Sequence, residues 1–425
     1  MKLLVIGAGG REHAIAWRLA QSPRVQTVFV APGNAGSATE AGVKNLDITD
    51  ASALADFAAN EPIHLTVVGP EAPLAAGIVD AFQARGLRIF GPSQACAQLE
   101  ASKEFAKTFM AEHRIPTAEY AAFSDAAAAH AYVESKGAPI VIKADGLASG
   151  KGVVVASNLS EAHKAIDWML IDHAMGSAGN RVVIEEFLDG EEASFIVMCD
   201  GRNILTLATS QDHKRLLDGD LGPNTGGMGA YSPAPVITPK IHSRVMREVI
   251  QPVMNGMAAR GTPYSGFLYA GLMINSKGDL KVLEFNCRLG DPETQPIMLR
   301  LKSDLFELFE CAVEGKLDTT EVEWDRRAAL GVVLAAHGYP ESPRKGDVIA
   351  TLPAGEEDFH VFQAGTVLQE GKVITDGGRV LCVTALGESI KIAQRRAYQV
   401  INEIRFPGMQ FRHDIGHRAL APRHS

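Results

Sequence analysis

The first part of the chain repeats one pattern, a short apolar run followed by a helical pattern, and this repeat constrains the fold more than any other feature. The apolar runs lie at 3–6, 27–30, 65–68 and 88–90, each is closed by a nearby Gly or Pro, and helical patterns such as 12–21 and 51–59 separate them. Strands that alternate with helices pair in parallel and carry helices on both faces of the sheet. The sequence therefore predicts an α/β fold that begins with a doubly wound parallel sheet, closing near Gly91 and Pro92.

The rest of the chain continues as α/β in further blocks. A helix from about 93 to 113 leads to a small sheet, with strands expected at 139–143, 153–156 and 181–186. A third block runs from Glu192 to about Leu317, and the remainder, with apolar runs at 330–335, 359–362 and 379–384, predicts a β-rich C-terminal domain. At about 150 residues per domain, a chain of 425 residues is expected to form about two to four domains.

Charge, cysteine content and hydropathy narrow the class of protein. A net charge of -9 argues against nonspecific nucleic-acid binding, and the locally basic stretch 391–425 suits a solvated helix face or a small phosphorylated ligand better. Five cysteines without a C-x-x-C pair indicate reduced thiols. The apolar start is too short for a signal peptide, and the longest apolar run, 328–336, falls short of the roughly 20 residues of a membrane span. We expect a soluble, cytoplasmic protein that binds neither nucleic acid nor membrane.

The segment 281–296, KVLEFNCRLGDPETQP, carries the clearest chemical signal. Its apolar residues predict a strand, on which Glu284 and Asn286 point to the same face. A carboxylate and an amide oxygen side by side suit Mg²⁺, which takes few protein ligands and keeps water and phosphate oxygens. The loop that follows adds Arg288, Asp291 and Glu293. A Glu-x-Asn pair also fits a solvated strand face, so the metal interpretation requires a nucleotide site elsewhere in the chain.

The N-terminal sequence GAGGREH, residues 7–13, follows a strand and opens a helix, which predicts an anion site. Glu12 stands where a dinucleotide fingerprint has its third glycine, and the second strand lacks the acid that would hold a ribose, so NAD is disfavoured. Arg11 suits a phosphate, while Glu12 and Asn34 suit sugar hydroxyls, so we expect a phosphorylated sugar. Glu71, at the exit of another strand, is expected in the same crevice. A glycine turn with a solvated helix start is the alternative.

Two further segments point to a polyphosphate and a nucleoside. A strand delivers Lys143 to a small-residue hairpin that contains Gly150, Lys151 and Gly152, although Gly152 excludes a Walker A loop. A plain hairpin would explain the glycines but not the lysine on the strand. The strand 182–186 then runs into a loop, where free backbone groups suit an adenine edge and a nearby carboxylate suits a ribose. Taken alone, this second segment also fits a structural strand.

The second and third blocks resemble an ATP-grasp domain, and the whole chain is similar to the phosphoribosylamine-glycine ligases, also called glycinamide ribonucleotide synthetases. The resemblance covers essentially the full length and rests on the following segments: GAGGREHA at 7–14, APGNAG at 31–36, GPEAPL at 69–74, IKADGLASGKGV at 142–153, EEFLDGEE at 185–192, SQDHKR at 210–215, GPNTGGMGAYSP at 222–233 and EFNCRLGDPETQ at 284–295. It implies an N-terminal substrate domain at 1–100, an ATP-grasp centre at 101–120 and 192–322, a lid at 121–191 and an α+β C-terminal domain at 323–425.

The resemblance also implies residue roles. ATP would be held by Lys103 and Lys143 at its phosphates, by the lid loop 144–153 with Gly150, Lys151 and Gly152, by Glu185, Glu186, Phe187 and Leu188 at adenine, and by Glu191 or Glu192 at the ribose. Mg²⁺ or Mn²⁺ would be held by Glu284 and Asn286, and 5-phosphoribosylamine by the first block, with Gly9, Gly10, Arg11, Glu12, His13, Asn34 and Glu71. Two departures stand out: Ala8 replaces the Asn that is frequent in the family, and the strand 266–274 lacks the further acidic metal ligand of many ATP-grasp enzymes.

The expected reaction is the ATP-dependent ligation of glycine to phosphoribosylamine through a glycyl phosphate, an early step of purine biosynthesis. Phosphoryl transfer needs positioning and charge neutralisation more than a protein nucleophile. We assign Arg288 to the glycine carboxylate or its acyl phosphate, and Asp291 to the glycine ammonium group. The rest of the site is expected to be framed by Asp212, His213, Lys214, Arg215 and the turn 224–229 with Gly226 and Gly227. His213 fits either a proton shuttle or a positioning role.

Three other functions remain open at the level of the sequence. A different ATP-grasp carboxylate-amine ligase of purine metabolism would share the lysines and the Glu-x-Asn pair. A nicotinamide-dependent dehydrogenase would explain the glycines but not the metal strand. A nucleotide sensor would bind ATP without releasing phosphate. For the ligase we expect a monomer with small-molecule substrates and transient contacts with neighbouring enzymes of the pathway.

Overall fold

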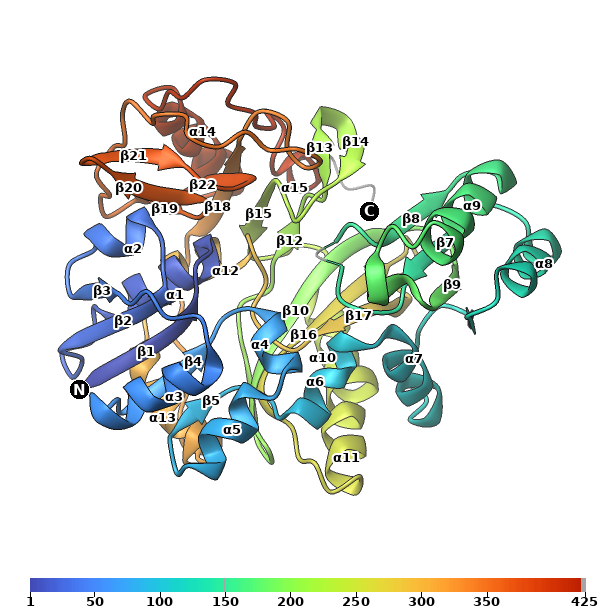
Figure 1. Ribbon diagram of the computed structural model, residues 1–425, viewed down its shortest axis with the longest axis horizontal. Coiled ribbons are helices and arrows are strands. Elements are labelled where there is room, and N and C mark those ends of the chain that lie inside the picture. Colours follow the sequence, from blue (N-terminus) through green and yellow to red (C-terminus); the bar gives the residue numbers. More distant parts are fainter. Residues whose placement is uncertain (149, 422–425) are drawn as a thin grey trace.

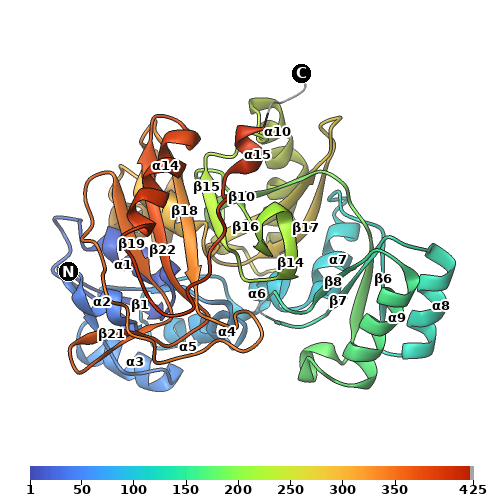
Figure 2. The ribbon, with the colours of Figure 1, turned by 90° about the horizontal axis from the view of Figure 1, so that it is seen from above.

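The structure, a computed structural model, describes residues 1–148 and 150–421. It is α/β throughout, with an N-terminal parallel sheet, a central antiparallel sheet, a small lid sheet and a C-terminal sheet (Figure 1). Seen from above, the lid stands at one end of the molecule and the C-terminal sheet lies over the N-terminal domain at the other (Figure 2). The predicted fold class is therefore confirmed.

The N-terminal sheet is wholly parallel, with the order β3-β2-β1-β4-β5. Its strands are β1 (Lys2–Gly7), β2 (Thr27–Pro32), β3 (Val43–Asn45), β4 (Leu65–Val68) and β5 (Ile89–Phe90), and its helices are α1 (Gly10–Leu19), α2 (Ala35–Thr39), α3 (Ala51–Asn60), α4 (Glu71–Ala75) and α5 (Ile78–Ala84). The chain order reverses between β1 and β4, and this switch point is where ligands bind in open α/β sheets. The exits of β1 and β4, with the GGREH and GPEAPL motifs, thus lie at one edge. The sequence did not predict β3, because only Val43 of its residues is buried.

The helix expected from 93 to 113 is in fact two helices, α6 (Gln94–Ala101) and α7 (Lys103–Glu112). Ser102 between them is extended, with φ -132° and ψ 117°, and its hydroxyl caps α7 by accepting from the Phe105 N–H. The Asp145 carboxylate accepts from the Ser102 hydroxyl at 3.2 Å and from the Glu104 N–H at 2.8 Å. The break lets α7 begin at Lys103, whose Nζ donates to the carbonyl of Gly146 at 3.1 Å.

The lid is a four-stranded antiparallel sheet with the order β6-β9-β7-β8. Its elements are β6 (Tyr120–Phe123), α8 (Ala126–Lys136), β7 (Ile140–Ala144), β8 (Val153–Ala156), α9 (Leu159–Ile166) and β9 (Val182–Glu186). Buried residues of α8 and α9, among them Val133 and Ile166, pack on the apolar residues of β7 and β9. The three predicted lid strands are present, whereas the half-buried β6 was not predicted.

The central sheet has the order β11-β10-β16-β17 and is antiparallel. It consists of β10 (Glu191–Asp200), β11 (Ile204–Thr206), β16 (Ser265–Ile274) and β17 (Leu280–Asn286). Helices α10 (Pro239–Val245) and α11 (Gln251–Ala259) supply Val245 and Val253 to the core that contains Phe195 and Leu268. The sheet ends at β17, which carries the Glu-x-Asn pair.

The C-terminal sheet joins two distant parts of the chain. Its order is β12-β15-β18-β22-β19, from β12 (Gln211–Asp212), β15 (Gly229–Ser232), β18 (Ala328–Ala335), β19 (Phe359–Gln363) and β22 (Arg379–Gly387). Helix α14 (Ile390–Ile401) packs on β18 and β22, and α12 (Thr294–Arg300) contacts both of these strands and α1. The remaining named elements include α13 (Leu305–Val313), α15 (His417–Leu420) and two hairpins, β13 (Arg215–Leu217) with β14 (Leu221–Asn224) and β20 (Thr366–Gln369) with β21 (Lys372–Thr375).

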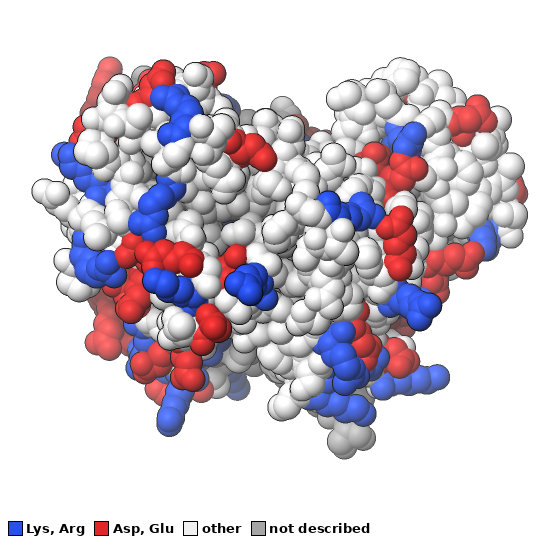
Figure 3. All heavy atoms as spheres, turned by 90° about the horizontal axis from the view of Figure 1, so that it is seen from below, with Lys and Arg blue, Asp and Glu red and all other residues white. Residues whose placement is uncertain are grey.

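The surface carries charges of both signs. Lys and Arg side chains are interspersed with Asp and Glu side chains on the face shown in Figure 3. Within the described ranges, we found no helix with the length and apolar character needed to cross a membrane.

Candidate active site

A cavity of about 810 Å³ opens where the N-terminal domain, the central sheet, the lid and the C-terminal sheet meet. All four parts contribute charged side chains to its lining, including Arg11, Glu71, Lys103, Lys107, Lys143, Glu185, Glu192, Asp212, Lys214, Glu284, Arg288, Asp291, Arg379 and Arg418, and Asn286 adds an amide. Its volume lies in the range typical of small-molecule sites. The structure thus brings most of the predicted site residues to one place.

The predicted metal pair lies on β17 with the expected geometry. Glu284 and Asn286 line the cavity, while Phe285 between them is 2% exposed and packs in the core. Burial raises the pKa of Glu284, but the charges of Lys214, Lys143 and Lys103 outweigh it and lower this pKa to about 2. The carboxylate is therefore ionised near neutral pH.

The donor atoms of this pair fit a hard cation. The Asn286 Nδ2 donates to Glu284 Oε1 at 3.4 Å, and its Oδ1 accepts from the Arg288 Nη2 at 3.1 Å. An amide oxygen has a second lone pair, so Oδ1 can serve a cation while it accepts from Arg288. Oxygen-only ligands favour Mg²⁺ or Mn²⁺.

A buried lysine–glutamate cluster stands beside the pair. Lys143 and Lys107 both place Nζ 3.1 Å from Oε2 of Glu185, and the Lys107 Nζ also donates to the Thr117 hydroxyl at 2.7 Å. Burial lowers the pKa of Lys107 to about 8, although Glu185 opposes the shift. The sequence interpretation missed Lys107, yet a signal was available: it lies four residues after Lys103 on α7, which places both on one helix face.

Arg288 is already held by carboxylates. Its Nε donates to Glu71 Oε2 at 3.2 Å, and its Nη2 lies 2.8 Å from Glu100 Oε1. Burial would lower the pKa of Arg288, but Glu100 and Glu71 raise it. Glu100 on α6 was also missed, because only the packing of α6 against β17 brings it to the site.

Asp291 is linked to the C-terminal sheet through Arg379. The Arg379 Nη1 donates to the carbonyl oxygens of Asp291 at 2.6 Å and of Gly226 at 2.8 Å, and the Gln295 Nε2 donates to Asp291 Oδ1 at 2.9 Å. Burial would raise the pKa of Asp291, but Arg379 and Arg11 lower it. No local pattern in the sequence marked Arg379, which begins β22.

The side chains of Arg11 and Glu12 bind each other, and Glu12 also binds the glycine turn that precedes α1. The Arg11 Nε donates to Glu12 Oε1 at 2.5 Å, and Glu12 Oε2 accepts from the Gly9 N–H at 2.7 Å. A Cβ on Gly69 would come within 2.0 Å of the Glu12 carboxylate, so glycine is required for Glu12 to approach the exit of β4. Arg11 lines the cavity, whereas Glu12 is 2% exposed and fastens the exits of β1 and β4.

His13 and Asn34, both predicted to bind substrate, lie outside the cavity lining and contact Gln363 of β19. The Gln363 N–H donates to His13 Nδ1 at 2.8 Å, and the Asn34 Nδ2 donates to the Gln363 carbonyl at 2.8 Å. The Asn34 Oδ1 accepts from the Gly36 and Ser37 N–H groups and caps α2. Asn34 also donates to the Ala8 carbonyl at 2.9 Å, a backbone contact that the Ala at position 8 preserves.

His13, Glu40 and His360 form a second polar cluster, with candidate ligand atoms within 4.8 Å of one another. Because His13 Nδ1 accepts from the Gln363 N–H, its Nε2 carries the proton and donates to Glu40 at 3.0 Å. The His360 Nε2 lies 2.7 Å from the same carboxylate oxygen. With the His13 Nε2 lone pair blocked by its proton, this cluster is a hydrogen-bonded junction between domains and does not suit a metal.

Most of the residues predicted to bind ATP line the cavity, and a few lie outside its lining. The lining includes Gly150, Gly152, Glu185, Glu186, Phe187, Leu188 and Glu192. Of the described residues to which the sequence assigned individual roles, these lie outside the lining: Gly9, Gly10, Glu12, His13, Asn34, Lys151, Glu191, His213 and Gly227. Residue 149 of the predicted lid loop lies outside the described residues.

His213 does not meet the needs of a proton shuttle. It is 0% exposed, and its Nε2 accepts from the Gly416 N–H at 3.1 Å. Burial and the charges of Arg418 and Arg412 lower the pKa of His213 to about 3, so the ring is neutral. Its neighbours Asp212 and Lys214 line the cavity, and Lys214 pairs with Glu192.

Comparison with known proteins identifies the same order of domains along the chain. Sequence models of three domains of phosphoribosylglycinamide synthetase match most of the chain: the N domain at residues 1–100, the ATP-grasp (A) domain at 101–294 and the C domain at 329–418. Phosphoribosylamine–glycine ligases of Ralstonia nicotianae and Vibrio cholerae are 64% and 62% identical to the chain, each over 99% of it, and the match covers 100% and 99% of those proteins.

Solved structures give the same result. The crystal structure of phosphoribosylamine–glycine ligase from Thermotoga maritima superposes with a TM-score of 0.83 at 35% identity, covering 98% of this chain and 100% of that one. A biotin carboxylase from Campylobacter jejuni, at 15% identity and a TM-score of 0.75 over 96% of this chain and 92% of its own, shares the fold. The chain belongs to the phosphoribosylglycinamide synthetase family, with an ATP-grasp domain at its centre.

Proposed function

We propose that the protein ligates glycine to 5-phosphoribosylamine at the expense of ATP, giving glycinamide ribonucleotide, ADP and phosphate. The observation that carries the proposal is the shared cavity. It connects Glu284 and Asn286, the proposed metal ligands beside the cavity lysines, to the switch point of the N-terminal sheet. A nucleotide and a phosphorylated sugar can therefore meet in one enclosed site. The 64% identity to a phosphoribosylamine–glycine ligase supports this substrate pair.

The chemistry follows from the charges around the cavity. Hydroxide is a poor leaving group, so glycine's carboxylate must first be phosphorylated before the amine can displace phosphate. Lys103 and Lys143 line the cavity beside Glu284 and would neutralise the charge that moves with the phosphoryl group. Glu284 and Asn286 would hold Mg²⁺ or Mn²⁺, which supplies further neutralisation at the phosphate oxygens.

The nucleotide would lie between the lid and the central sheet. Backbone groups of 185–188 would bind adenine, and Glu192, or Glu191 beside it, would bind the ribose. Gly150, Lys151 and Gly152 would close over the phosphates. In support of this placement, the lid hairpin approaches the turn at 224–225, because a Cβ on Gly150 would meet the Thr225 carbonyl at 3.2 Å.

The acceptor would lie on the side of the N-terminal domain. Because Glu71 and Glu100 already hold its guanidinium, Arg288 would act as a fixed positive charge that attracts glycine's carboxylate. Asp291, with its lowered pKa, would bind the ammonium group. Arg11 and the start of α1, with Gly9 and Gly10, would hold the sugar phosphate.

Asp212 would take the proton that the amine loses when it attacks. Burial raises the pKa of Asp212, and the neighbouring carboxylates Glu293 and Glu192 raise it further, while Lys214 opposes them. A carboxylate with a raised pKa is a stronger base than an exposed one.

Release of ADP across a panel of amino acids, with and without phosphoribosylamine, tests this proposal. We expect release that requires both glycine and the amine. Release with another carboxylate substrate would indicate a different ATP-grasp ligase, and ATP binding without release would indicate a sensor. A nicotinamide spectrum in the purified protein would indicate a dehydrogenase.

The cellular setting is part of the same proposal. We infer a cytoplasmic monomer, divided near residues 100, 120, 191 and 322, that contacts neighbouring purine-pathway enzymes transiently. Light scattering on the purified protein tests the monomer, and a stable dimer would contradict it.

A further inference from the structure

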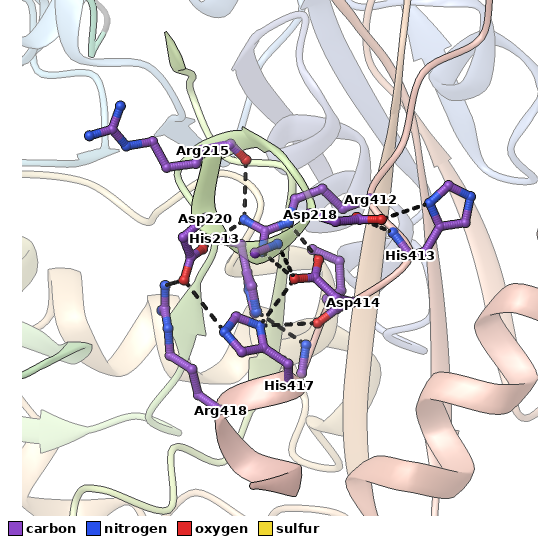
Figure 4. A network of polar contacts seen from close by, with 12 residues as sticks. His213, Arg215, Asp218, Asp220, Arg412, His413, Asp414, His417 and Arg418 are labelled. Carbon is purple, nitrogen blue, oxygen red and sulfur yellow. Dashed lines mark hydrogen bonds and ion pairs between the residues drawn. The ribbon is translucent and has the colours of Figure 1, made fainter. Parts of the chain in front are cut away.

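Residues 412–418, which include the start of α15, lie against the hairpin β13–β14 in the middle of the chain (Figures 1 and 4). We call 412–418 the brace. It contacts the same stretch of chain that carries Asp212 and Lys214 into the cavity. The brace therefore connects a late part of the sequence to the site.

The first contacts are with the segment 212–215, which joins β12 to β13 beside the cavity. The Gly416 N–H donates to the His213 ring at 3.1 Å, and the Arg412 Nη1 donates to the Arg215 carbonyl at 3.2 Å. Asp212 and Lys214 line the cavity, whereas the His213 ring between them is buried and accepts from the brace. Figure 4 shows the Arg215 carbonyl turned to Arg412 and its guanidinium turned away.

The second set of contacts is ionic and holds the turn of the hairpin. Asp220 accepts from the Arg412 Nη1 at 2.8 Å and from the Arg418 Nη2 at 3.0 Å. Asp414 of the brace accepts from Arg412 at 2.7 Å and from the Gly219 N–H at 2.9 Å. The Arg412 side chain is 0% exposed, so its two carboxylate partners compensate a fully buried charge.

Arg418 differs from Arg412 because it reaches the cavity. Its side chain is 25% exposed and is part of the lining. Its Nη1 donates to the backbone carbonyl of Asp212 at 3.2 Å, while its Nη2 holds Asp220. The Arg418 guanidinium thus connects Asp212, at the end of β12, to Asp220, in the turn of the β13–β14 hairpin.

We propose that the brace fixes the segment 212–215, which joins β12 to β13 and carries Asp212 and Lys214, and that Arg418 is its principal positioning residue. This inference rests on the proposed ligase function. Lys214 lies among Glu192, Asp212 and Glu284, so a shift of its backbone changes the charge balance at the metal pair. The proposed adenine residues 185–188 belong to the lid and its exit loop, so the same shift leaves the adenine contacts intact. Glu192, proposed for the ribose, pairs with Lys214, so the shift changes ATP binding less than it changes kcat.

Replacement of Arg418 tests the inference through kinetics. Arg418→Ala should lower kcat about tenfold or more, equivalent to roughly 1.4 kcal/mol of barrier, with a smaller change in KM for ATP. Arg418→Lys, which can keep one of the two contacts, should recover part of the loss. Arg395→Ala, on the exposed face of α14, is the matched control and should behave as wild type.

Two further measurements keep the inference independent of activity. Hydrogen exchange of 212–217 should become faster in Arg418→Ala and in Asp220→Asn, which breaks the brace without touching the Asp212 carbonyl. A double-mutant cycle between Asp220 and Arg418 should show coupling, because the two side chains are in contact.

The outcomes are distinguishable. Wild-type kcat and wild-type exchange in Arg418→Ala would overturn the brace. A raised KM for ATP with unchanged kcat would make Arg418 a ligand-binding residue and would also overturn the positioning role. If the wild-type protein itself shows no glycine-dependent ADP release, the proposed function fails, and hydrogen exchange still decides whether the brace exists.

Discussion

At the scale of single residues, most charges in the cavity are already paired with one another. Glu185 is shared by Lys107 and Lys143, and Arg288 by Glu71 and Glu100. Paired charges are held in place before substrate arrives, so they cost little reorganisation when charge moves in the reaction. The site is therefore arranged as a fixed electrostatic environment.

Replacement of Glu284 tests the metal pair. Glu284→Ala removes the ionised ligand of the pair, and we expect kcat to fall by more than about a hundredfold, comparable to the loss of a single electrostatic group in other sites. The measurement is steady-state ADP release at saturating Mg²⁺. Glu357→Ala, at an exposed carboxylate, should stay within about twofold of wild type. Full activity in Glu284→Ala would contradict the metal assignment.

At the scale of elements, the break between α6 and α7 directs a helix start to the cavity. Ser102 caps α7, and the Asp145 carboxylate binds both the cap and the Glu104 N–H. The amphipathic pattern of 93–113 concealed this break, because a serine is tolerated inside a helix and its partner Asp145 lies in another block. A polar contact between segments converted one predicted helix into two.

Loss of this cap should affect both stability and ATP use. Ser102→Ala should cost about 1 kcal/mol of unfolding free energy and raise KM for ATP, because Lys103 begins α7. Asp125→Ala removes the cap of α8 in the lid and is the matched control, with a similar loss of stability and an unchanged KM. Chemical denaturation and ATP titration of the two variants make the comparison. Equal KM values in both would show that the cap does not position Lys103.

At the scale of the whole molecule, the C-terminal sheet is joined to the N-terminal domain and to the site. Gln363 binds His13 and Asn34, and the Glu40 carboxylate binds His13 and His360. Aromatic contacts of Trp17 with His360 and Phe362 extend the junction. These contacts indicate that the N-terminal and C-terminal domains move together.

The Glu40 junction makes stability depend on pH. Burial raises the pKa of Glu40, but hydrogen bonds from His13 and His360 lower it to about 2, from an ordinary value of 4.5. A pKa lowered by folding means that this stabilisation is fully present above about pH 4.5 and is lost as pH falls towards 2. Glu40→Gln should lower the melting temperature at pH 6, with a difference from wild type that shrinks as pH is lowered through this window. A difference that stays constant with pH would show that the Glu40 charge does not stabilise the junction.

Arg379 tests whether the C-terminal sheet completes the substrate site. Arg379→Ala removes donors to the carbonyls of Asp291 and Gly226, so we expect KM for glycine or phosphoribosylamine to rise about tenfold or more while ATP affinity stays unchanged. Calorimetric ATP binding and two-substrate kinetics separate these effects. Weakened ATP binding with unchanged substrate KM values would place Arg379 on the nucleotide side.

The sequence by itself determined the parallel pairing of the first sheet, three of the four lid strands and the placement of Glu284 and Asn286 on one strand. Each depends on short-range rules: alternating apolar runs, glycines at strand exits and the two-residue period of a strand. The order of motifs along the chain also indicated the family to which the comparisons assign it.

Only the tertiary structure decided which charged groups meet. Glu100, Lys107, Arg379 and Arg418 line the cavity, while His13 and Asn34 contact Gln363 of the C-terminal sheet. The physical reason is that a side chain's role depends on its partners, and sheet pairing brings those partners from distant parts of the chain. Local patterns specify strands and helices, whereas the balance of burial and charge at a site is set by elements that the sequence does not place side by side.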